Sequence, residues 1–364
     1  MRVTVVRPGD LGPSEADLWA RFQRLSPVMS SPFLSLTFAQ VVDRFRPVAR
    51  VAVVEDGGKI EAFLPFERAA LATGVPIGHP MNDLHGFIGS GAPIDARLVV
   101  RRSGLRGWRF AHAPAEQRAL APFHYDGLAV QAPVIDLGNG YHSYLSSRSK
   151  NFRKIAGKKR RALERQFGAL SLEWGSSCPA ENLLQLIDQK AGKYYGTRRL
   201  FSDQTALRIV EELATADNDD CQGIVSVVFA GEKPIARFMG ILAQRRLSAW
   251  FASYDPDLSR FSPGMLMYLA LAEEGAGRGI TLIDLCSGQD VYKFHLANDS
   301  YPVAAGAVWV SRTEDAARKV YRRLMHRTSP NDRMPAWVRS RLEILNISDG
   351  PGKVVEPVPL TEPE

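Results

Sequence analysis

The sequence predicts an α/β fold built on a mixed, mainly antiparallel sheet that is flanked by helices. In the C-terminal half, three strand-like apolar runs are joined by very short turns, which is typical of an antiparallel meander. A helix, a buried strand, a second helix and a final strand follow, and this order favours one sheet with helices packed against it. The predicted strands cover 224–230, 234–244, 247–254, 281–285 and 304–311, and the predicted helices cover 265–278 and 290–297.

The N-terminal half shows a weaker pattern of the same class. Two strand-like runs, 48–55 and 59–66, are joined by Asp56-Gly57-Gly58, a connection with the chemistry of a hairpin turn. Loops rich in Gly, Pro and His interrupt the pattern after that hairpin. Helical periodicity then predicts helices over 141–167, 180–195 and 203–216.

The length of the chain, 364 residues, favours two packed α/β halves rather than one core. We expect a first half at 1–140, a helical region at 141–220 that leads into the second half, and a C-terminal core at 221–328. A basic helix at 314–327 ends that core, and a Pro-rich tail follows at 329–364.

Composition excludes several classes of protein. Hydrophobic residues make up 45% of the chain and charged residues 23%, which is ordinary for a globular protein. The N-terminus has charges and a proline where a secretory signal needs an apolar run, so we expect a cytoplasmic protein. The three cysteines, Cys178, Cys221 and Cys286, fit neither a disulfide framework nor a zinc site, and no metal is expected.

One segment carries most of the positive charge. Residues 148–165 contain five Arg, four Lys and one Glu, a local excess of +8 in a chain whose net charge is +7. This basic helix suits an acidic carrier protein, RNA, or anionic lipid at the inner face of the membrane, unless it is a solvated helix face. Only Phe152 and Phe167 are aromatic, which argues against stacking on single-stranded RNA.

Four motifs carry a resemblance to a known family: YLSSRSKNFRKIAGKKRRALER, TRRLFSD, SYDPDLSRFSPGMLMYLAL and LIDLCSGQDVYKF. With the strand and helix order, they resemble the GNAT acyltransferases, and in particular the CelD/BcsL-type acetyltransferases associated with bacterial exopolysaccharide synthesis. That type is similar to the FemAB aminoacyltransferases and contains two GNAT-like halves. The resemblance extends from Phe33 to about Arg312 and implies tandem GNAT-like halves.

The resemblance implies a donor site in the second half. Ser262 can cap a helix, Pro263 suits the first helical position, and Gly264 lets a ligand approach the backbone closely. The N-terminus of such a helix favours an anion, although the same residues fit a helix start without a ligand. In GNAT enzymes the corresponding loop holds the coenzyme A pyrophosphate, which places a donor phosphate near Gly264 and Met265. Strand amides near Ala252 and Ser253 would stabilise the oxyanion. No tightly bound cofactor is expected, and acyl-CoA or an acyl carrier protein would be the co-substrate.

Three residues are the catalytic candidates. Tyr292 lies where many GNAT enzymes carry a tyrosine that protonates the departing thiolate, and Lys293 could hold phosphate or developing negative charge. Asp284 could accept the acceptor's proton or orient Lys293, or it could cap the next turn. A packed Tyr292 beside a solvated Lys293 is the structural alternative. We expect Cys286 to be an inert thiol, because no paired His follows from the spacing.

The acceptor site is expected in the first half. The loop between Pro80 and Gly86 offers hydrogen-bonding groups to an amine or hydroxyl, although turn chemistry explains Asn-Asp equally well. Arg198, Arg199 and Arg237 are possible anion ligands, and Arg237 interrupts an apolar strand that could instead have one solvated face. The predicted substrate-binding residues are Asn82, Asp83, His85, Arg198, Arg237 and Tyr254.

These residues favour an acyltransferase that moves an acyl group from a thioester donor to an amine or hydroxyl of a cell-envelope precursor, a polysaccharide or a lipid. A FemAB-like transferase that uses aminoacyl-tRNA is one alternative. A non-catalytic GNAT-like module that docks a biosynthetic complex on the membrane is the other.

Overall fold

The computed structural model describes residues 1–193, 198, 200–286, 290–313 and 315–316. The chain divides into two units, Met1–Val310 and Ser311–Glu364, of which the first is described below. The Pro-rich tail at 329–364 and the predicted helix at 314–327, apart from residues 315 and 316, lie outside the described residues.

The first unit contains two halves with the same order of elements. Each half has an edge strand, two helices, three antiparallel strands, a helix, a parallel strand and a last long strand. In the first half these are β1 (Arg2–Val6), α1 (Pro13–Gln23), α2 (Leu36–Phe45), β2 (Ala49–Asp56), β3 (Lys59–Ala69), β4 (Thr73–Pro76), α3 (Ala96–Arg102), β6 (Gly107–Pro114) and β7 (His124–Asp136), with the short β5 (Ile88–Gly89) beside β3.

The second half begins with two helices on the surface, α4 (Gly140–Ser147) and α5 (Lys150–Phe167). It then repeats the pattern of the first half. Its elements are β8 (Leu170–Glu173), α6 (Pro179–Lys193), α8 (Gln204–Ala214), β9 (Asp217–Asn218), β10 (Cys221–Ala230), β11 (Lys233–Ala243), β12 (Arg246–Tyr254), α9 (Pro263–Gly277), β13 (Leu282–Asp284), α10 (Val291–Leu296) and β14 (Asp299–Trp309).

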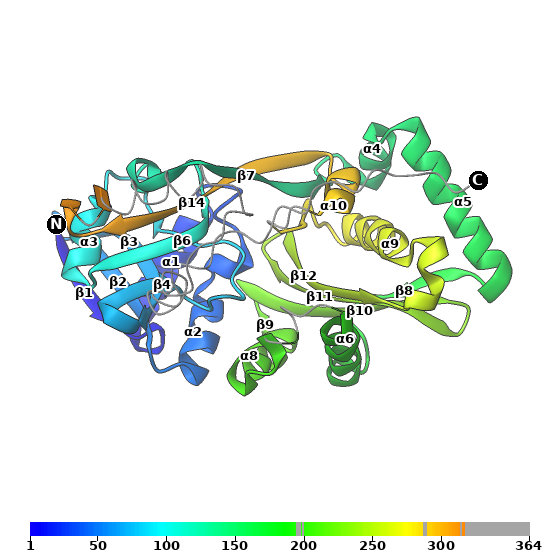
Figure 1. Cartoon of the computed structure of the whole chain (residues 1–364), viewed down its shortest axis with the longest axis horizontal. Coiled ribbons are helices and arrows are strands. Elements are labelled where there is room, and N and C mark those ends of the chain that lie inside the picture. Colours follow the sequence, from blue (N-terminus) through cyan, green and yellow to red (C-terminus); the bar gives the residue numbers. More distant parts are fainter. Residues whose placement is uncertain (194–197, 199, 287–289, 314, 317–364) are drawn as a thin grey trace, which may run out of the picture. The chain divides into compact units, whose positions relative to one another are not determined.

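The two halves exchange their last strands within one sheet. The strand order is β1-β2-β3-β4-β6-β14-β7-β13-β12-β11-β10-β8, so β7 of the first half pairs with β13 of the second, and β14 pairs with β6. β7 and β14 also pair with each other along most of their length (Figure 1). The order reads as a palindrome in which β7 and β14 are equivalent. Two tandem halves, each with a mixed, mainly antiparallel sheet flanked by helices, are therefore confirmed, and the exchange joins them into one compact unit.

Helices cover both faces of the sheet. In the second half, α6 and α8 lie on one face and α9 on the other (Figure 1). One core cluster joins both halves on the face that carries α1, α2, α6 and α8, through Trp19, Phe38, Leu186 and Ile209. The opposite face has a separate core in each half, around Leu64, Val99 and Trp108 in the first and around Leu163, Leu271 and Ile283 in the second.

Most of the predicted elements are confirmed. The hairpin turns at Gly57 and Gly58, both with positive φ, and the meander β10-β11-β12 is antiparallel. The single helix expected over 141–167 is wrong, because Arg148 is extended (ψ 150°) and the Ser149 hydroxyl accepts the N–H of Phe152 to start a new helix. The last strand begins earlier than expected, because Asp299–Pro302 already pair with β7.

Candidate functional site

The two parallel strands of the second half separate after a short pairing. β13 pairs with β12 only over Arg246–Ser248, and β12 continues to Tyr254 after β13 has ended at Asp284. The register of β12 against β11 shifts at the same point, so that Trp250 has no partner residue on β11. A bulge of this kind re-aims the strand, and the part of β12 beyond Ser248 presents backbone groups that β13 does not pair.

Asp284, at the end of β13, is a buried ion-pair partner. Its Oδ2 accepts hydrogen bonds from Arg246 Nη2 at 2.6 Å and from the Tyr301 hydroxyl at 2.8 Å. Its Oδ1 accepts the N–H of Cys286 at 2.9 Å, so the carboxylate does cap the following turn. Burial opposes the charge of Arg246, but Asp284 and then Tyr301 raise the pKa of its guanidinium. Both carboxylate oxygens are engaged, which favours a positioning role for Asp284 over direct proton transfer.

A loop of the first half is attached to the bulge of β12. The indole Nε1 of Trp250 donates to the carbonyl oxygen of Met81 at 2.9 Å. The side chain of Asn82 holds the loop itself: Nδ2 donates to the Ile77 carbonyl at 2.9 Å, and Oδ1 accepts the N–H of Leu84 at 2.9 Å. Asn82 is buried and its amide is occupied by backbone, so turn chemistry accounts for this residue.

His85 fixes the same loop to β6. Two residues of β6, Ala111 and His112, face the single residue Ala305 of β14, and this bulge frees two backbone N–H groups. His85 Nε2 accepts both of them, at 2.9 and 3.0 Å. Burial holds the pKa of His85 well below its usual value, so the ring is neutral. The result is a rigid connection between the loop and His112.

Asp83 and His112 face each other across this connection. Asp83 Oδ1 lies 3.8 Å from His112 Nδ1, and both side chains are 30% exposed. Burial lowers the pKa of His112, an effect that the Asp83 carboxylate opposes and that Lys293 reinforces. His112 is therefore a neutral base at neutral pH, within reach of solvent and of a carboxylate that can orient its ring.

Two lysines of the second half complete this polar centre, which we define as Asp83, His112, Lys190 and Lys293. Lys190, on α6, points at the bulged strand, with Nζ 3.4 Å from the carbonyl oxygen of Ala252. Burial lowers the pKa of Lys190, and repulsion from Lys293 lowers it further. Lys293 is only 12% exposed, and its Nζ lies 3.8 Å from Asp290 Oδ2. Two nearby, largely buried ammonium groups form an electropositive spot beside β12.

Cys286 lies among these groups but is a protonated thiol. Its Sγ donates to the Ala249 carbonyl oxygen at 3.2 Å and contacts the Asp83 carboxylate. Burial raises the pKa of Cys286 well above its usual value, and Asp83 and Asp284 raise it further. A buried thiol with this shift is a poor nucleophile, as the sequence suggested.

Tyr292 lies at the exposed side of the centre. It is 48% exposed on α10, and its ring centroid is 6.4 Å from that of Tyr268, a buried residue of α9. Burial raises the pKa of Tyr268 well above its usual value, and the neighbouring Tyr292, which shares a hydrogen bond with it, raises it further. The two phenols can therefore pass a proton toward the surface.

The start of α9 differs in one detail from the prediction. Ser262 is in the left-handed conformation (φ 55°) and its hydroxyl makes no cap, so the predicted side-chain cap is wrong. Pro263 does occupy the first turn. The first hydrogen bond of the helix runs from Leu266 N to Ser262 O, which leaves the N–H groups of Gly264 and Met265 directed out of the helix end. A Cβ on Gly264 would approach the Tyr254 ring at 3.6 Å, an ordinary contact.

Other predicted residues are engaged elsewhere. Arg237 donates to Asn182 Oδ1 at 3.1 Å and to Gln185, which ties β11 to α6, and the residue is only 8% exposed. Arg198 donates to the carbonyl oxygen of Ala191 at 3.3 Å on the surface, and Arg199 lies outside the described residues. Ser253 donates to Gln189 Oε1 at 2.9 Å, which attaches β12 to the helix that carries Lys190.

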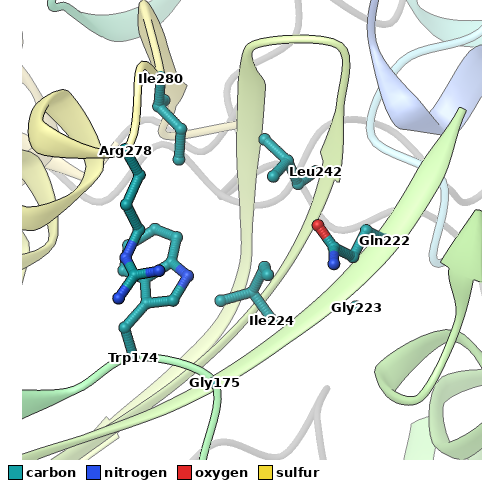
Figure 2. Close-up of a pocket in the computed structure, with 8 residues that line it drawn as sticks. All are labelled: Trp174, Gly175, Gln222, Gly223, Ile224, Leu242, Arg278 and Ile280. Atoms are coloured by element: carbon teal, nitrogen blue, oxygen red, sulfur yellow. The ribbon is translucent and has the colours of Figure 1, made fainter. Parts of the chain in front are cut away.

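A separate cavity lies at the far end of the sheet. Its volume is about 370 Å³, and Figure 2 shows the guanidinium of Arg278 over the ring of Trp174, 5.5 Å from its centroid. Its lining residues are Trp174, Gly175, Gln222, Gly223, Ile224, Leu242, Arg278 and Ile280. None of them belongs to the polar centre, which lies at the opposite end of β12.

Two further kinds of site were sought in the described part of the chain. No group of three or more His, Cys, Asp or Glu in residues 1–193, 200–286 and 290–313 is placed to hold a metal ion. No helix within those ranges is both long enough and apolar enough to cross a membrane.

The fold and part of the sequence resemble known proteins. Residues 150–294 match the family model described as "Acetyltransferase (GNAT) domain". A search of curated protein sequences found no significant match. The crystal structure of FemX is 9% identical, with 88% of this chain and 100% of that chain aligned and a TM-score of 0.56.

A conserved protein of unknown function from Bacteroides thetaiotaomicron is 9% identical, with 82% of this chain and 98% of that chain aligned and a TM-score of 0.50. Such low identities show a shared fold and nothing more. The match of residues 150–294 to the acetyltransferase domain model supports a transferase.

Proposed function

We propose that the protein transfers an acyl group from a thioester donor to an amine or hydroxyl acceptor at the polar centre. One observation carries the proposal: Asp83 and His112 of the first half meet Lys190 and Lys293 of the second beside the unpaired part of β12. Lys190, Lys293 and β12 lie within residues 150–294, which match the acetyltransferase model, whereas Asp83 and His112 precede them. The acceptor class we favour is a polysaccharide or lipid precursor of the cell envelope, as in the CelD/BcsL-type enzymes that the motifs resemble.

On the acceptor side, His112 is the proposed base. Its lowered pKa keeps the ring neutral at neutral pH, and Asp83, 3.8 Å from Nδ1, can tighten onto it when a substrate excludes water. The lone pair on Nε2 would then take the proton of the attacking amine or hydroxyl. His85 holds the backbone of His112 and so keeps this base in register.

On the donor side, the lysines are the proposed electrostatic stabilisers. When the acceptor attacks the thioester carbonyl, negative charge develops on its oxygen, and Lys190, Lys293 and strand amides near Ala252 and Ser253 can stabilise it. As the carbon–sulfur bond breaks, Tyr292 would give its proton to the thiolate, with Tyr268 behind it. Asp284 supports this step by holding the backbone of Cys286 at the end of β13.

The donor's phosphate groups would lie at the start of α9. The N–H groups of Gly264 and Met265 and the helix dipole both favour an anion there. The end of β12 faces this helix start through Tyr254, whose ring lies beside Gly264. A carrier held at α9 can therefore lay its thioester along the unpaired part of β12 toward the lysines.

A transferase that uses aminoacyl-tRNA is the second candidate. The basic helix α5 would suit that polyanion. Ribonuclease treatment separates the two candidates, because it would abolish transfer from a nucleic-acid donor and leave transfer from a thioester intact.

Turnover measurements test the proposal. The purified protein would be incubated with acetyl-CoA or a long-chain acyl-CoA and a panel of amino sugars, sugars and long-chain amines, and the release of free thiol would be followed. The wild type is compared with Lys293→Met and with Lys59→Met, a surface control on the β2-β3 hairpin. Thiol release that Lys293→Met reduces and Lys59→Met does not would support the proposal, and equal rates in all three would remove Lys293 from the mechanism.

A further inference from the structure

The outward face of α5 carries an unbroken row of five cations. Successive members are four, four, three and four residues apart, so they lie on one side of the helix within less than a quarter of its circumference. The row spans fifteen residue steps, about 22 Å at 1.5 Å per residue. Its members, all exposed, are Lys150, Lys154, Lys158, Arg161 and Arg165. We call this set the α5 row.

The α5 row has no counter-charge within the described chain. The one acidic residue of the helix, Glu164, is bonded to Arg160 at 2.9 Å, on a different side of the helix. None of the five cations forms an ion pair or a hydrogen bond with another described residue. Like charges at four-residue spacing destabilise a helix, so the row is a cost to the isolated protein.

Packing on the opposite side fixes the direction of the row. Ala156 and Leu163 are buried against the second half, and the ring of Phe167 meets the ring of Phe261 edge-on at 5.9 Å. The apolar side of α5 is therefore used for packing within the protein. The five cations face solvent as a preformed, rigid surface.

The helix is attached to the segment that leads into the proposed donor site. Lys159 donates to the carbonyl oxygen of Arg260, and Arg260 donates to Gln166 Oε1 at 2.8 Å. Arg260 belongs to the 3-10 segment Pro256–Phe261, which runs directly into Ser262 and the N-terminus of α9. The α5 row therefore lies on the donor side of the enzyme, and Figure 1 shows α5 next to α9 at the end away from the first half.

We propose that the donor is an acidic carrier protein that docks on the α5 row while its thioester arm enters at the start of α9. This inference rests on the proposed acyl transfer. The row is about 22 Å long. A small carrier whose phosphates bind at the start of α9 would contact few of its five cations, whereas the surface of an acidic protein can contact all of them. The row has no aromatic member for stacking bases, and Ile155 is the one large apolar side chain that the helix exposes, too little to anchor it in lipid. Both features favour a protein partner over RNA or a membrane.

The test uses one triple variant and a control of equal charge. Lys154→Gln, Lys158→Gln and Arg161→Gln together remove the centre of the row. Lys59→Gln, Arg118→Gln and Arg208→Gln together remove three exposed cations that lie elsewhere on the surface. Neither variant touches the polar centre, so both should fold and bind a small thioester like the wild type.

Two readouts separate this inference from the proposed function. Binding of a purified acidic bacterial acyl carrier protein, loaded with a long-chain acyl group, is measured by fluorescence anisotropy at low and moderate salt. Thiol release is measured in parallel from that carrier and from acyl-pantetheine, which has neither protein nor nucleotide. The row variant should bind the carrier at least tenfold more weakly and raise its KM to match, with acyl-pantetheine kinetics unchanged, and the control should resemble the wild type.

Each other outcome is informative. Equal binding by the row variant and the control overturns the docking inference, and so does a row that binds phosphatidylglycerol vesicles or tRNA but not the carrier. Carrier binding that depends on the row, without thiol release from any thioester, supports docking and refutes acyl transfer.

Discussion

Replacing Asp284 with Asn should destabilise the protein by about 3–5 kcal/mol, because it leaves the Arg246 guanidinium buried without its anion. The side chains of Arg246 and Asp284 are 3% and 2% exposed and lie 2.6 Å apart, so water cannot replace the lost partner. The Asn side chain has nearly the same shape and can still accept the N–H of Cys286, which confines the change to charge. A cost of this size is a large share of the roughly 5–15 kcal/mol that stabilises a typical domain.

Urea unfolding, followed by tryptophan fluorescence, measures this cost. The matched control is Asp255→Asn, which removes an ion pair to Lys233 of 2.9 Å whose side chains are 22% and 43% exposed. Exposed pairs contribute about 0–1 kcal/mol, so the control should lose little. If Asp284→Asn and Asp255→Asn lose the same free energy, the buried network does not hold the end of β13 in the way described here.

Four further predictions concern the polar centre and its supports. Lys293→Met should lower kcat by about 10²–10³ with a small change in KM, measured by thiol release, since it removes charge stabilisation of the transition state. Tyr292→Phe should slow turnover without loss of stability, and full turnover would remove Tyr292 from the mechanism. Because burial lowers the pKa of His112, turnover should stay constant at pH 7 and decline only as the pH falls below about 6.5, when His112 gains a proton. The variant His112→Gln should lose most of the rate and should not show this decline. The pKa of buried His85 lies well below its unfolded value of about 6.5. The contribution of His85 to the free energy of unfolding is therefore complete above about pH 6.5 and is lost as the pH falls below it. The stability of a His85→Gln variant should depend less on pH between about pH 4 and 6.5.

The second half could be predicted from sequence because its signals are local. The meander β10-β11-β12 has turns of two residues, and α9 begins where the Ser-Pro-Gly motif predicts. The exchange of β7 and β14 could not be predicted in the same way. Alternation of apolar residues shows that a segment forms a strand, whereas its neighbours in the sheet depend on contacts between distant parts of the chain.

The candidate site was predicted in part. Asp83 and Lys293 were identified from their motifs, and the structure places both in the polar centre. His112 and Lys190 were missed, because nothing next to them in the sequence distinguishes them from surface residues. His112 owes its position to a bulge in β6, and Lys190 to the way α6 packs on β12, and both depend on tertiary structure.

The central claim is that a thioester donor binds with its phosphates at the start of α9, and titration calorimetry with acetyl-CoA and a long-chain acyl-CoA tests it most directly. Gly264→Glu places an anion at the helix start, where a Cβ has room, and Gly277→Glu places the same charge at the other end of α9, where nothing lies within 4 Å. We predict saturable binding to the wild type, at least tenfold weaker binding to Gly264→Glu, and unchanged binding to Gly277→Glu. Binding that Gly264→Glu leaves intact would contradict the claim, and no binding of either acyl-CoA to the wild type would exclude coenzyme A as the carrier.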